Sequence, residues 1–269
     1  MDYSNINEFK TANGYDIYGM WYPRVTAIVS IKSKPALYRF YAGQKSFAAA
    51  EEMKNKSAEE GTLVHEVVEG LLGGKPTPIP DSVVPVVAAF HDFKKQHEII
   101  PHQIETKIMS RKHGYAGTID VLAEVDGRLG VLDIKTSYAI WRDYGIQTAA
   151  YVEALHEDKN MPRLARWILR LDQSHHCLNA CGATMRTKGG IEKVREAFPR
   201  RKYNCAHVWG DCTGEVELKE LDNLEHDTQA FLAAKSLWEW EHDNWLRQFR
   251  NPNLRISSES TNFTNKLNF

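Results

Sequence analysis

Residues 57–74 carry apolar side chains at helical spacing, with Ser57 and Glu60 in capping-box positions at the start and Gly73 at the end. The apolar positions form one arc of a helical wheel: Val64, Val67, Val68, Leu71 and Leu72. The pattern predicts an amphipathic helix, and it places His65 at the border of the apolar arc.

Runs of β-branched and apolar residues predict three consecutive strands, followed later by a fourth. They cover residues 99–110, 115–125, 128–137 and 166–173. Helical patterns surround them, at residues 36–56, 83–98, 138–156 and 222–250. This order predicts an α/β fold in which a central mixed β-sheet is flanked by helices, with a helical N-terminal part.

The chain has 269 residues, of which 42% are hydrophobic and 26% charged, and this is enough for one large core. We expect a single domain over residues 1–250, with its core at about 57–172 and a C-terminal helix at about 222–249. Residues 174–215 are irregular in pattern and are interpreted as an insertion or subdomain. Residues 251–269 are polar and are interpreted as a tail.

An Asp-Gly pair at residues 126–127 joins the second and third predicted strands and is typical of a two-residue hairpin turn. If Val125 pairs with Arg128, Asp120 falls directly opposite Asp133, and Lys135 shares the face of Asp133. Opposed carboxylates repel unless a cation lies between them, and Mg²⁺ accepts one or two carboxylates while it keeps several waters. The pattern therefore indicates a metal site; a salt-bridged pair on a solvated strand face is the alternative for Asp133 and Lys135 alone.

Glu105 lies on the preceding strand and reaches the Asp120 face if a tight turn at residues 112–114 joins the two strands. Lys135 would then position or activate a water, or offset charge that grows on a phosphate.

Four motifs in order resemble those of the PD-(D/E)xK nucleases, and within them the RecB-type exonuclease group. They are GTLVHEVVE, GTID, LDIKTS and QTAAY, which together cover about residues 61–155. The group includes mitochondrial genome maintenance exonucleases and CRISPR adaptation nucleases, and the segment YPRVTAIVS is similar to an element near their start. Ile119 replaces the proline of the family name, which is common in this group.

The resemblance implies a restriction-endonuclease-like core that binds one or two Mg²⁺ or Mn²⁺ ions. The implied ligands are His65, Asp120, Asp133 and the main-chain carbonyl of Ile134. Lys135 would be the catalytic lysine, Glu105 would match an acidic position of some members, and Gln147 and Tyr151 would face the site or the DNA. The plainer alternatives are a core-edge histidine for His65, a solvated glutamate for Glu69 and helix packing for Tyr151.

The implied reaction is hydrolysis of DNA phosphodiester bonds by metal-activated water. We expect an exonuclease that acts on single-stranded or duplex DNA ends, in end processing, recombination or phage replication. The alternatives are a structure-specific or restriction-type endonuclease on the same core, and a catalytically inactive nucleic-acid-binding protein.

All four cysteines lie in residues 177–212: Cys177, Cys181, Cys205 and Cys212. They could bind a structural zinc ion together with nearby histidines such as His207. The lack of a strict CxxC pair favours reduced thiols, and the lack of a cysteine before the nuclease motifs argues against an iron–sulfur cluster.

Charge and hydropathy limit the other function classes. No apolar run approaches the ~20 residues that span a bilayer, and the N-terminus has no signal pattern, so the sequence predicts a cytoplasmic protein without a membrane partner. The formal net charge is −1, so a DNA-binding surface must be local. Residues 185–202, with seven Lys or Arg against two Glu, are a candidate for it, and a solvated basic surface is the alternative.

Overall fold

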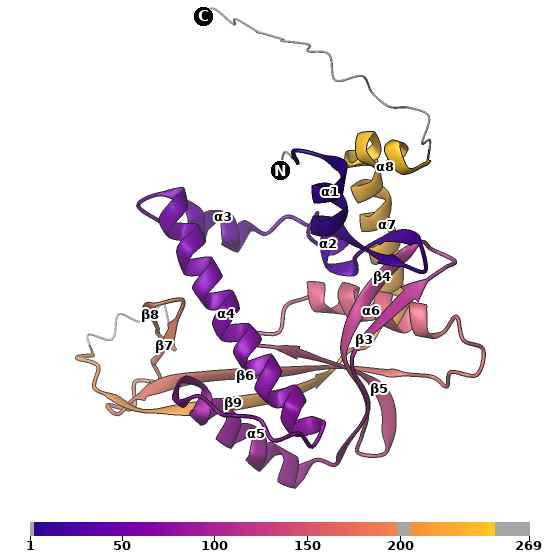
Figure 1. The fold of residues 1–269 in the computed structure, drawn as a ribbon. Helices are drawn as coiled ribbons and strands as arrows, with labels where there is room; N and C mark the ends of the chain where they lie inside the picture. Colours follow the sequence, from indigo (N-terminus) through magenta and orange to yellow (C-terminus); the bar gives the residue numbers. More distant parts are fainter. Residues whose placement is uncertain (1–2, 198–204, 251–269) are drawn as a thin grey trace, which may run out of the picture.

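A mixed β-sheet with helices on both faces forms the centre of the computed structural model, which describes residues 3–197 and 205–250 (Figure 1). Within the described residues this sheet has seven strands: β3 (Ile99–Ser110), β4 (Tyr115–Val125), β5 (Arg128–Lys135), β6 (Ala165–Cys177), β7 (Thr184–Lys188), β8 (Ile191–Arg195) and β9 (Trp209–Glu220). The predicted α/β class with a mixed sheet flanked by helices is confirmed at this level.

The helices divide between an N-terminal group, two central elements and a C-terminal pair. They are α1 (Ile6–Asn13), α2 (Val25–Val29), α3 (Pro35–Ala42), α4 (Phe47–Leu72), α5 (Val84–Gln96), α6 (Asp143–Leu155), α7 (Leu224–Glu241) and α8 (Asp243–Arg250), with a short 3₁₀ turn, η1 (Asp81–Val83). A separate two-stranded hairpin, β1 (Gly14–Ile17) and β2 (Met20–Pro23), lies between α1 and α2. None of the helices in the described part of the chain is both long and apolar enough to cross a membrane.

Helix α4 corrects the predicted start at Ser57. The helix begins ten positions earlier, at Phe47, and its N-cap is Ser46, whose hydroxyl accepts a hydrogen bond from the Ala49 amide at 3.2 Å. The intervening segment is rich in alanine, glutamate and lysine, which are strong helix formers, and it contains no proline to stop the helix. Ser57 is therefore an interior residue and the capping box was wrong, whereas the helix does end before Gly73 as predicted.

The three predicted strands appear where the sequence places them, and β5 stops two residues early, at Lys135. The turn residues Asp126 and Gly127 both have positive φ, 49° and 77°, as a type I′ hairpin requires. Val125 pairs with Arg128, and the same register continues to Val121 opposite Leu132. The register prediction is confirmed to the position immediately before Asp120 and Asp133.

Strand β6 organises the C-terminal half of the sheet. Its first half pairs in parallel with β5, and β9 pairs antiparallel along its other edge. Beyond the end of β5, the edge of β6 that β5 leaves free pairs with β7 at His175 and His176. The β7–β8 hairpin therefore continues the sheet directly after Lys135.

The segment 174–215 is thus more regular than predicted. It contains the end of β6, the β7–β8 hairpin and the start of β9, and residues 198–204 lie outside the described residues. Short strands with many charged residues give a weak period-two signal, which explains why they were missed. The predicted tail, residues 251–269, also lies outside the described residues.

Two other helix predictions differ in detail. Residues 222–250 form two helices instead of one, because α7 ends at Glu241, with His242 as its C-cap, and α8 begins at Asp243. Helix α6 begins at Asp143 and not near Tyr138, because the chain first turns at Ser137, whose hydroxyl donates to the Ala139 carbonyl at 2.7 Å. The turn separates the end of β5 from the helix that follows it.

The core has two parts, one on each face of the sheet. Helices α4 and α5 cover one face, where they pack on apolar residues of β4, β5, β6 and β9. Helices α1, α2, α6 and α7 gather on the other face around the buried rings of Phe9, Tyr115, Phe231 and Trp238. The carboxyl end of β5 lies between α4 and α6: Gln147 of α6 donates to Asp133, and His65 of α4 lies beside Asp120 on the neighbouring strand β4.

Candidate active site

Two carboxylates meet where the ladder between β4 and β5 ends. Asp133 on β5 is fully buried, and the side chain of Asp120 on β4 is 14% exposed. The Asp120 Oδ2 atom accepts a hydrogen bond from the Ile134 amide at 2.7 Å, in place of a backbone ladder bond. Since the N–H and C=O of a strand residue point to the same side, the Ile134 carbonyl faces the same gap.

Lys135 lies beside these carboxylates, as the two-residue periodicity predicted. Its Nζ atom is 2.5 Å from Asp133 Oδ2, and no other donor of the described residues reaches that buried oxygen. Burial opposes the charged ammonium, but Asp133 and Asp120 outweigh it and raise the pKa of Lys135 above its ordinary value. Lys135 is therefore a cation at neutral pH, which favours a role in offsetting charge over a role as a general base.

The surroundings of Asp120 disfavour the charged form of its carboxyl group. Burial, and after it the charge of Asp133, raise the pKa of Asp120 from 3.8 to about 7, although Lys135 and His65 act in the opposite direction. A carboxyl group with such a pKa is poised to exchange its proton for a metal ion near neutral pH.

Helix α4 brings two further ligand-type groups to Asp120. His65 Nδ1 lies 3.9 Å from Asp120 Oδ2 and 3.4 Å from Glu69 Oε1. Burial disfavours protonation of His65, but Glu69 and Asp120 more than compensate and raise its pKa. Both α4 side chains are largely buried, at 26% and 12% exposure, so the solvated interpretation of Glu69 was wrong.

The motif glycine of α4 explains why this helix can lie so close to the strand end. A Cβ atom at Gly61 would stand 2.8 Å from the Thr136 hydroxyl oxygen, which follows Lys135 directly. Glycine at this position therefore lets α4 approach the end of β5 closely enough for His65 to reach Asp120.

Glu105 lies opposite Asp120 on the neighbouring strand, flanked by the pairs Ile104 with Val121 and Thr106 with Ile119. Its φ of 50° is rare for a residue other than glycine and marks local strain in β3. Burial, followed by the charge of Glu69, raises the pKa of Glu105. The predicted proximity of Glu105 to the site is therefore present, although its side chain meets Glu69 and is not a member of the closest ligand group.

Helix α6 supplies Gln147 and Tyr151 from the other face of the sheet. The Gln147 amide donates to Asp133 Oδ1 at 3.1 Å and to the Tyr151 hydroxyl oxygen at 2.9 Å. Tyr151 is 2% exposed, and burial, together with the charges of Asp133 and Asp120, raises its pKa well above the ordinary value. Gln147, which is partly buried, holds Asp133 in place, and the buried Tyr151 supports Gln147 in turn.

Gly117 provides the space for Tyr151. A Cβ atom there would lie 2.6 Å from the Tyr151 ring and 3.2 Å from Val25, so we expect Gly117→Ala to lower the free energy of unfolding by about 1–3 kcal/mol. Urea denaturation measures this change. Gly43→Ala is the matched control, because Gly43 has φ −88° and its added Cβ would make contacts of 3.4 Å or longer. Equal effects of the two substitutions would contradict the packing argument.

The donor set fits a divalent metal ion. Ligand atoms of His65, Glu69 and Asp120 lie within 4.8 Å of one another, and Asp133 Oδ2 adds a buried oxygen that is paired with the Lys135 ammonium. The implied ligand set is therefore met in part: His65 and Asp120 belong to the closest group, Asp133 lies outside it, and Glu69 joins it. The His-x-x-x-Glu spacing on α4 was the signal that could have indicated Glu69.

A groove of about 560 Å³ opens beside this group, between α4 and the end of β5. It is lined by Gly61, His65, Glu66, Glu69, Glu105 and Thr136, among others. A ligand in this groove meets His65 and Glu69 directly, whereas Asp120 and Asp133 lie behind them and are not part of the lining.

Three of the four predicted zinc cysteines lie together at a different place, at the end of β6. Cys177, Cys181 and Cys205 converge there with His207. Cys212 does not join them, because it pairs with His175 further along the ladder between β6 and β9. The spacing of the cysteines in the sequence could not exclude Cys212 from this cluster, but the register of the β6–β9 ladder does.

Comparison with known proteins adds no assignment. No protein-family model matches the chain, and a search of curated proteins finds no match.

Proposed function

We propose that this protein is a metal-dependent deoxyribonuclease of the PD-(D/E)xK type, with a restriction-endonuclease-like core, that degrades DNA from its ends. The observation that carries the proposal is the meeting of Asp120, Asp133 and Lys135 at one strand end, with His65 3.9 Å from Asp120. Two carboxylates, a cation and an imidazole are the set that metal-assisted phosphodiester hydrolysis needs.

Each residue has a defined part in this proposal. His65, Asp120, Asp133 and the Ile134 carbonyl would hold Mg²⁺ or Mn²⁺, and Glu69 would contribute from α4. The bound ion supplies a more acidic water and neutralises charge on the phosphate. Lys135 places a fixed positive charge where negative charge grows on the phosphate, and Gln147 keeps Asp133 oriented.

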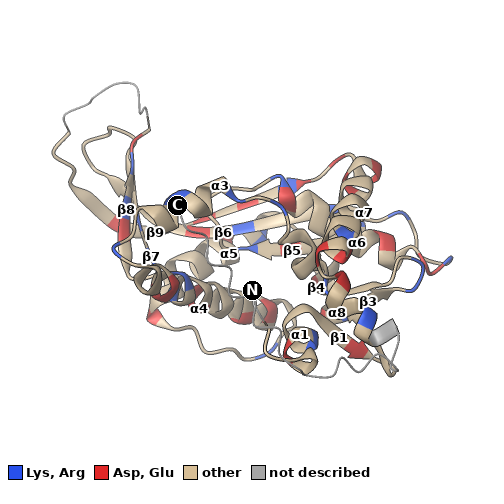
Figure 2. Ribbon diagram, turned by 90° about the horizontal axis from the view of Figure 1, so that it is seen from above, with Lys and Arg blue, Asp and Glu red and all other residues tan. Residues whose placement is uncertain are grey.

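Basic residues beside the site support DNA as the substrate. Figure 2 shows charges of both signs spread over the fold, with basic residues present on the β7–β8 hairpin. Arg186 and Lys188 on β7 donate to the Thr136 carbonyl and hydroxyl, and Lys193 on β8 is exposed. Arg186 is already paired with Asp172, and Lys188 is held at Thr136, so the exposed Lys193 is the hairpin cation that is open to a phosphate backbone.

Exposed aromatic rings follow Lys135 closely. Tyr138 is 42% exposed and Trp141 is 48% exposed, in the turn between β5 and α6. Aromatic rings of this kind stack on unpaired bases without sequence preference. Trp141 offers such a ring to an unpaired base at a frayed or single-stranded end, whereas the Arg195 guanidinium already lies over the Tyr138 ring.

The substrate form tests the proposal. End-labelled single strands, linear duplex and covalently closed circular DNA are incubated with Mg²⁺ or Mn²⁺, and the products are separated by size. We expect nucleotides or short fragments from the linear substrates and intact closed circles. Cutting of closed circles would instead show an endonuclease on the same core, and metal-dependent cutting of no substrate would favour a nucleic-acid-binding protein without activity.

A further inference from the structure

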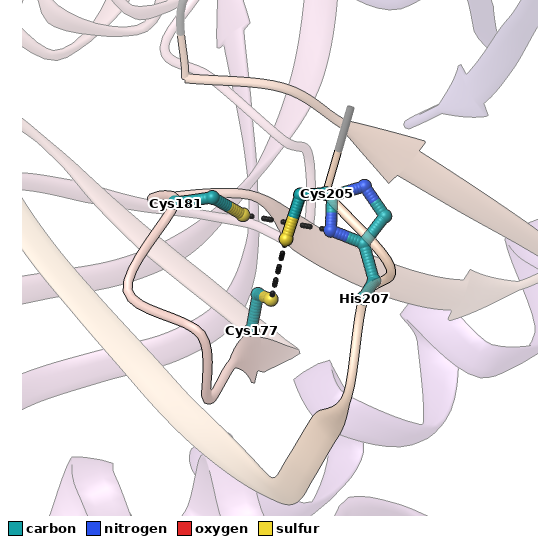
Figure 3. Close-up of side chains that lie close together, drawn as sticks. All are labelled: Cys177, Cys181, Cys205 and His207. Atoms are coloured by element: carbon teal, nitrogen blue, oxygen red, sulfur yellow. Dashed lines mark hydrogen bonds between the residues drawn. The ribbon is translucent and has the colours of Figure 1, made fainter. Parts of the chain in front are cut away.

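A second cluster of metal-type ligands lies at the end of β6 that the proposed nuclease site does not use. Figure 3 shows the sulfurs of Cys177, Cys181 and Cys205 and the Nδ1 atom of His207 pointing toward a common point. These four atoms lie within 4.8 Å of one another. From this geometry we infer that the protein binds one structural Zn²⁺ ion through Cys177, Cys181, Cys205 and His207.

The interatomic distances match a tetrahedral ion. Zn–S bonds of about 2.3 Å place two thiolates of a tetrahedron about 3.8 Å apart, and a thiolate and an imidazole nitrogen about 3.6 Å apart. Cys177 and Cys205 sulfurs are 3.9 Å apart, and the Cys181 sulfur is 3.5 Å from His207 Nδ1. A disulfide needs about 2.05 Å, so the 3.9 Å separation is too long for a disulfide and agrees with the spacing of two ligands of one ion.

The local backbone presents the ligands in two short pairs. Cys177 and Cys181 flank a tight turn in which Ala180 has φ 53°, and the Ala180 amide donates to the Cys177 carbonyl at 3.2 Å. Cys205 and His207 come from the segment that leads into β9, where the Leu178 amide is bonded to the Val208 carbonyl at 2.8 Å. The two pairs therefore face each other across the start of the β6–β9 ladder.

Groups around the ligands support thiolates. The Asn179 side-chain amide lies 3.8 Å from the Cys205 sulfur and donates to the Ala206 carbonyl at 2.6 Å. Such outer contacts hold metal ligands in position.

A larger cluster does not fit the same four atoms. The ligands of an iron–sulfur cluster, whether cysteines or histidines, are spread over two or more iron atoms, whereas the four ligand atoms here lie within 4.8 Å of one another and surround the space of a single ion. Cys177 is buried and the other three ligands are partly exposed, which leaves a path for the ion.

The site would fix the base of the β7–β8 hairpin. The Cys177 amide bonds to the Ala183 carbonyl at 3.0 Å, immediately before β7, and β7 then reaches Thr136 at the end of the catalytic strand. A zinc ion at the end of β6 therefore ties the start of the hairpin to β9. This role is structural, and zinc binding at this site does not depend on the proposed nuclease activity.

The test is metal content and ligand identity in the full-length protein. We expect about one zinc per chain in protein purified without chelator, and release of that zinc when thiols are modified. Replacement by Co²⁺ should give the visible spectrum of a tetrahedral ion with thiolate charge-transfer bands, and removal of the ion should lower Tm by at least about 5 °C.

Variants identify the ligands. Cys205→Ser and His207→Ala should reduce bound zinc by about tenfold or more, whereas His207→Cys should retain it and strengthen the charge-transfer bands of the Co²⁺ form. Cys212→Ser is the matched control and should keep one zinc ion, since Cys212 lies outside the cluster.

Several results would overturn the inference, and the wild-type protein alone can supply them if a variant fails to fold. They are purified protein without zinc and with all four thiols reactive, an octahedral Co²⁺ spectrum, or a disulfide between Cys177 and Cys205 in unreduced protein. Equal zinc loss in Cys212→Ser and Cys205→Ser would overturn the ligand assignment.

Discussion

Lys135→Met is expected to lower metal-dependent DNA cleavage by about 10²–10³-fold while leaving the fold and most metal binding intact. Methionine has a similar length to lysine but carries no charge, and so it removes the cation that lies 2.5 Å from Asp133 Oδ2. The raised pKa of Lys135 keeps its side chain positively charged throughout the reaction. Its attraction to the phosphate increases as negative charge grows there in the transition state, so the substitution should lower kcat more than it raises KM.

Lys107→Met is the matched control for this variant. Lys107 lies on β3, and its Nζ atom is 5.3 Å from the centre of the Tyr15 ring, as Lys135 Nζ is 5.3 Å from the centre of the Tyr144 ring. Lys107 is exposed and pairs with Thr118, and its described contact is with the Tyr15 ring and not with Asp120 or Asp133, so we expect cleavage within about twofold of wild type. A Lys135→Met protein that cleaves DNA at the same rate as Lys107→Met would exclude a catalytic role for Lys135.

Asp120→Asn is expected to abolish cleavage and at the same time to stabilise the metal-free protein. Asparagine can still accept the hydrogen bond from Ile134, but it provides no charge for a metal ion. The charged Asp120 costs folding energy, because its pKa is about 7 in the folded protein against 3.8 ordinarily. The difference between the two pKa values corresponds to at most about 4 kcal/mol of folding free energy. Because the asparagine amide must also be buried, we expect Asp120→Asn to raise the free energy of unfolding by about 1–2 kcal/mol at pH 8.

The pH dependence follows from the direction of that shift. Between pH 3.8 and about 7 the folded state holds a proton on Asp120 that the unfolded state releases, so the contribution of this group to stability falls as pH rises through that window. In Asp120→Asn this fall should disappear, and urea denaturation of chelated protein from pH 5 to pH 8 measures it. Asp92→Asn, on the exposed face of α5, is the control and should follow wild type.

Added metal should make wild type more stable than Asp120→Asn. Mg²⁺ or Mn²⁺ must displace the Asp120 proton, so metal affinity should decline as pH falls below about 7, and only wild type should gain Tm when metal is added. An Asp120→Asn protein that is less stable than wild type without metal, or that gains as much Tm with metal, would contradict the assignment of Asp120 as a ligand.

The arrangement of the carboxylates could be predicted because one turn determines it. The Asp-Gly pair at residues 126–127 fixes the β4–β5 register, and the register carries Asp120 to Asp133 without any information on the rest of the fold. The apolar arc of α4 likewise located His65 at the core border.

The contribution of α4 to the ligand group could be predicted only in part. The i, i+4 spacing of His65 and Glu69 was visible in the sequence, but whether Glu69 turns to solvent or to Asp120 depends on how closely the helix lies against Thr136. That distance is a tertiary property set by packing, and no local pattern reports it.

Strand β9 is the clearest missed element. Val216 and Leu218 alternate with charged residues and gave a period-two signal, but the strand also contains Cys212 and two glycines, which suggested irregular structure. Its pairing with β6 is a contact between segments about forty residues apart, and sequence periodicity does not specify partners at such separations. The same pairing decides which cysteines meet.

In our proposal, the residues at the carboxyl end of β5 carry out metal-dependent hydrolysis of DNA. The most direct measurement is the release of acid-soluble nucleotides from linear duplex DNA by the full-length protein, in the presence of Mn²⁺ or of chelator, with Asp133→Asn in parallel. We predict release by wild type with Mn²⁺, and none with chelator or with Asp133→Asn. Folded wild-type protein that releases no nucleotides with Mn²⁺ or Mg²⁺, or an Asp133→Asn protein as active as wild type, would contradict the account.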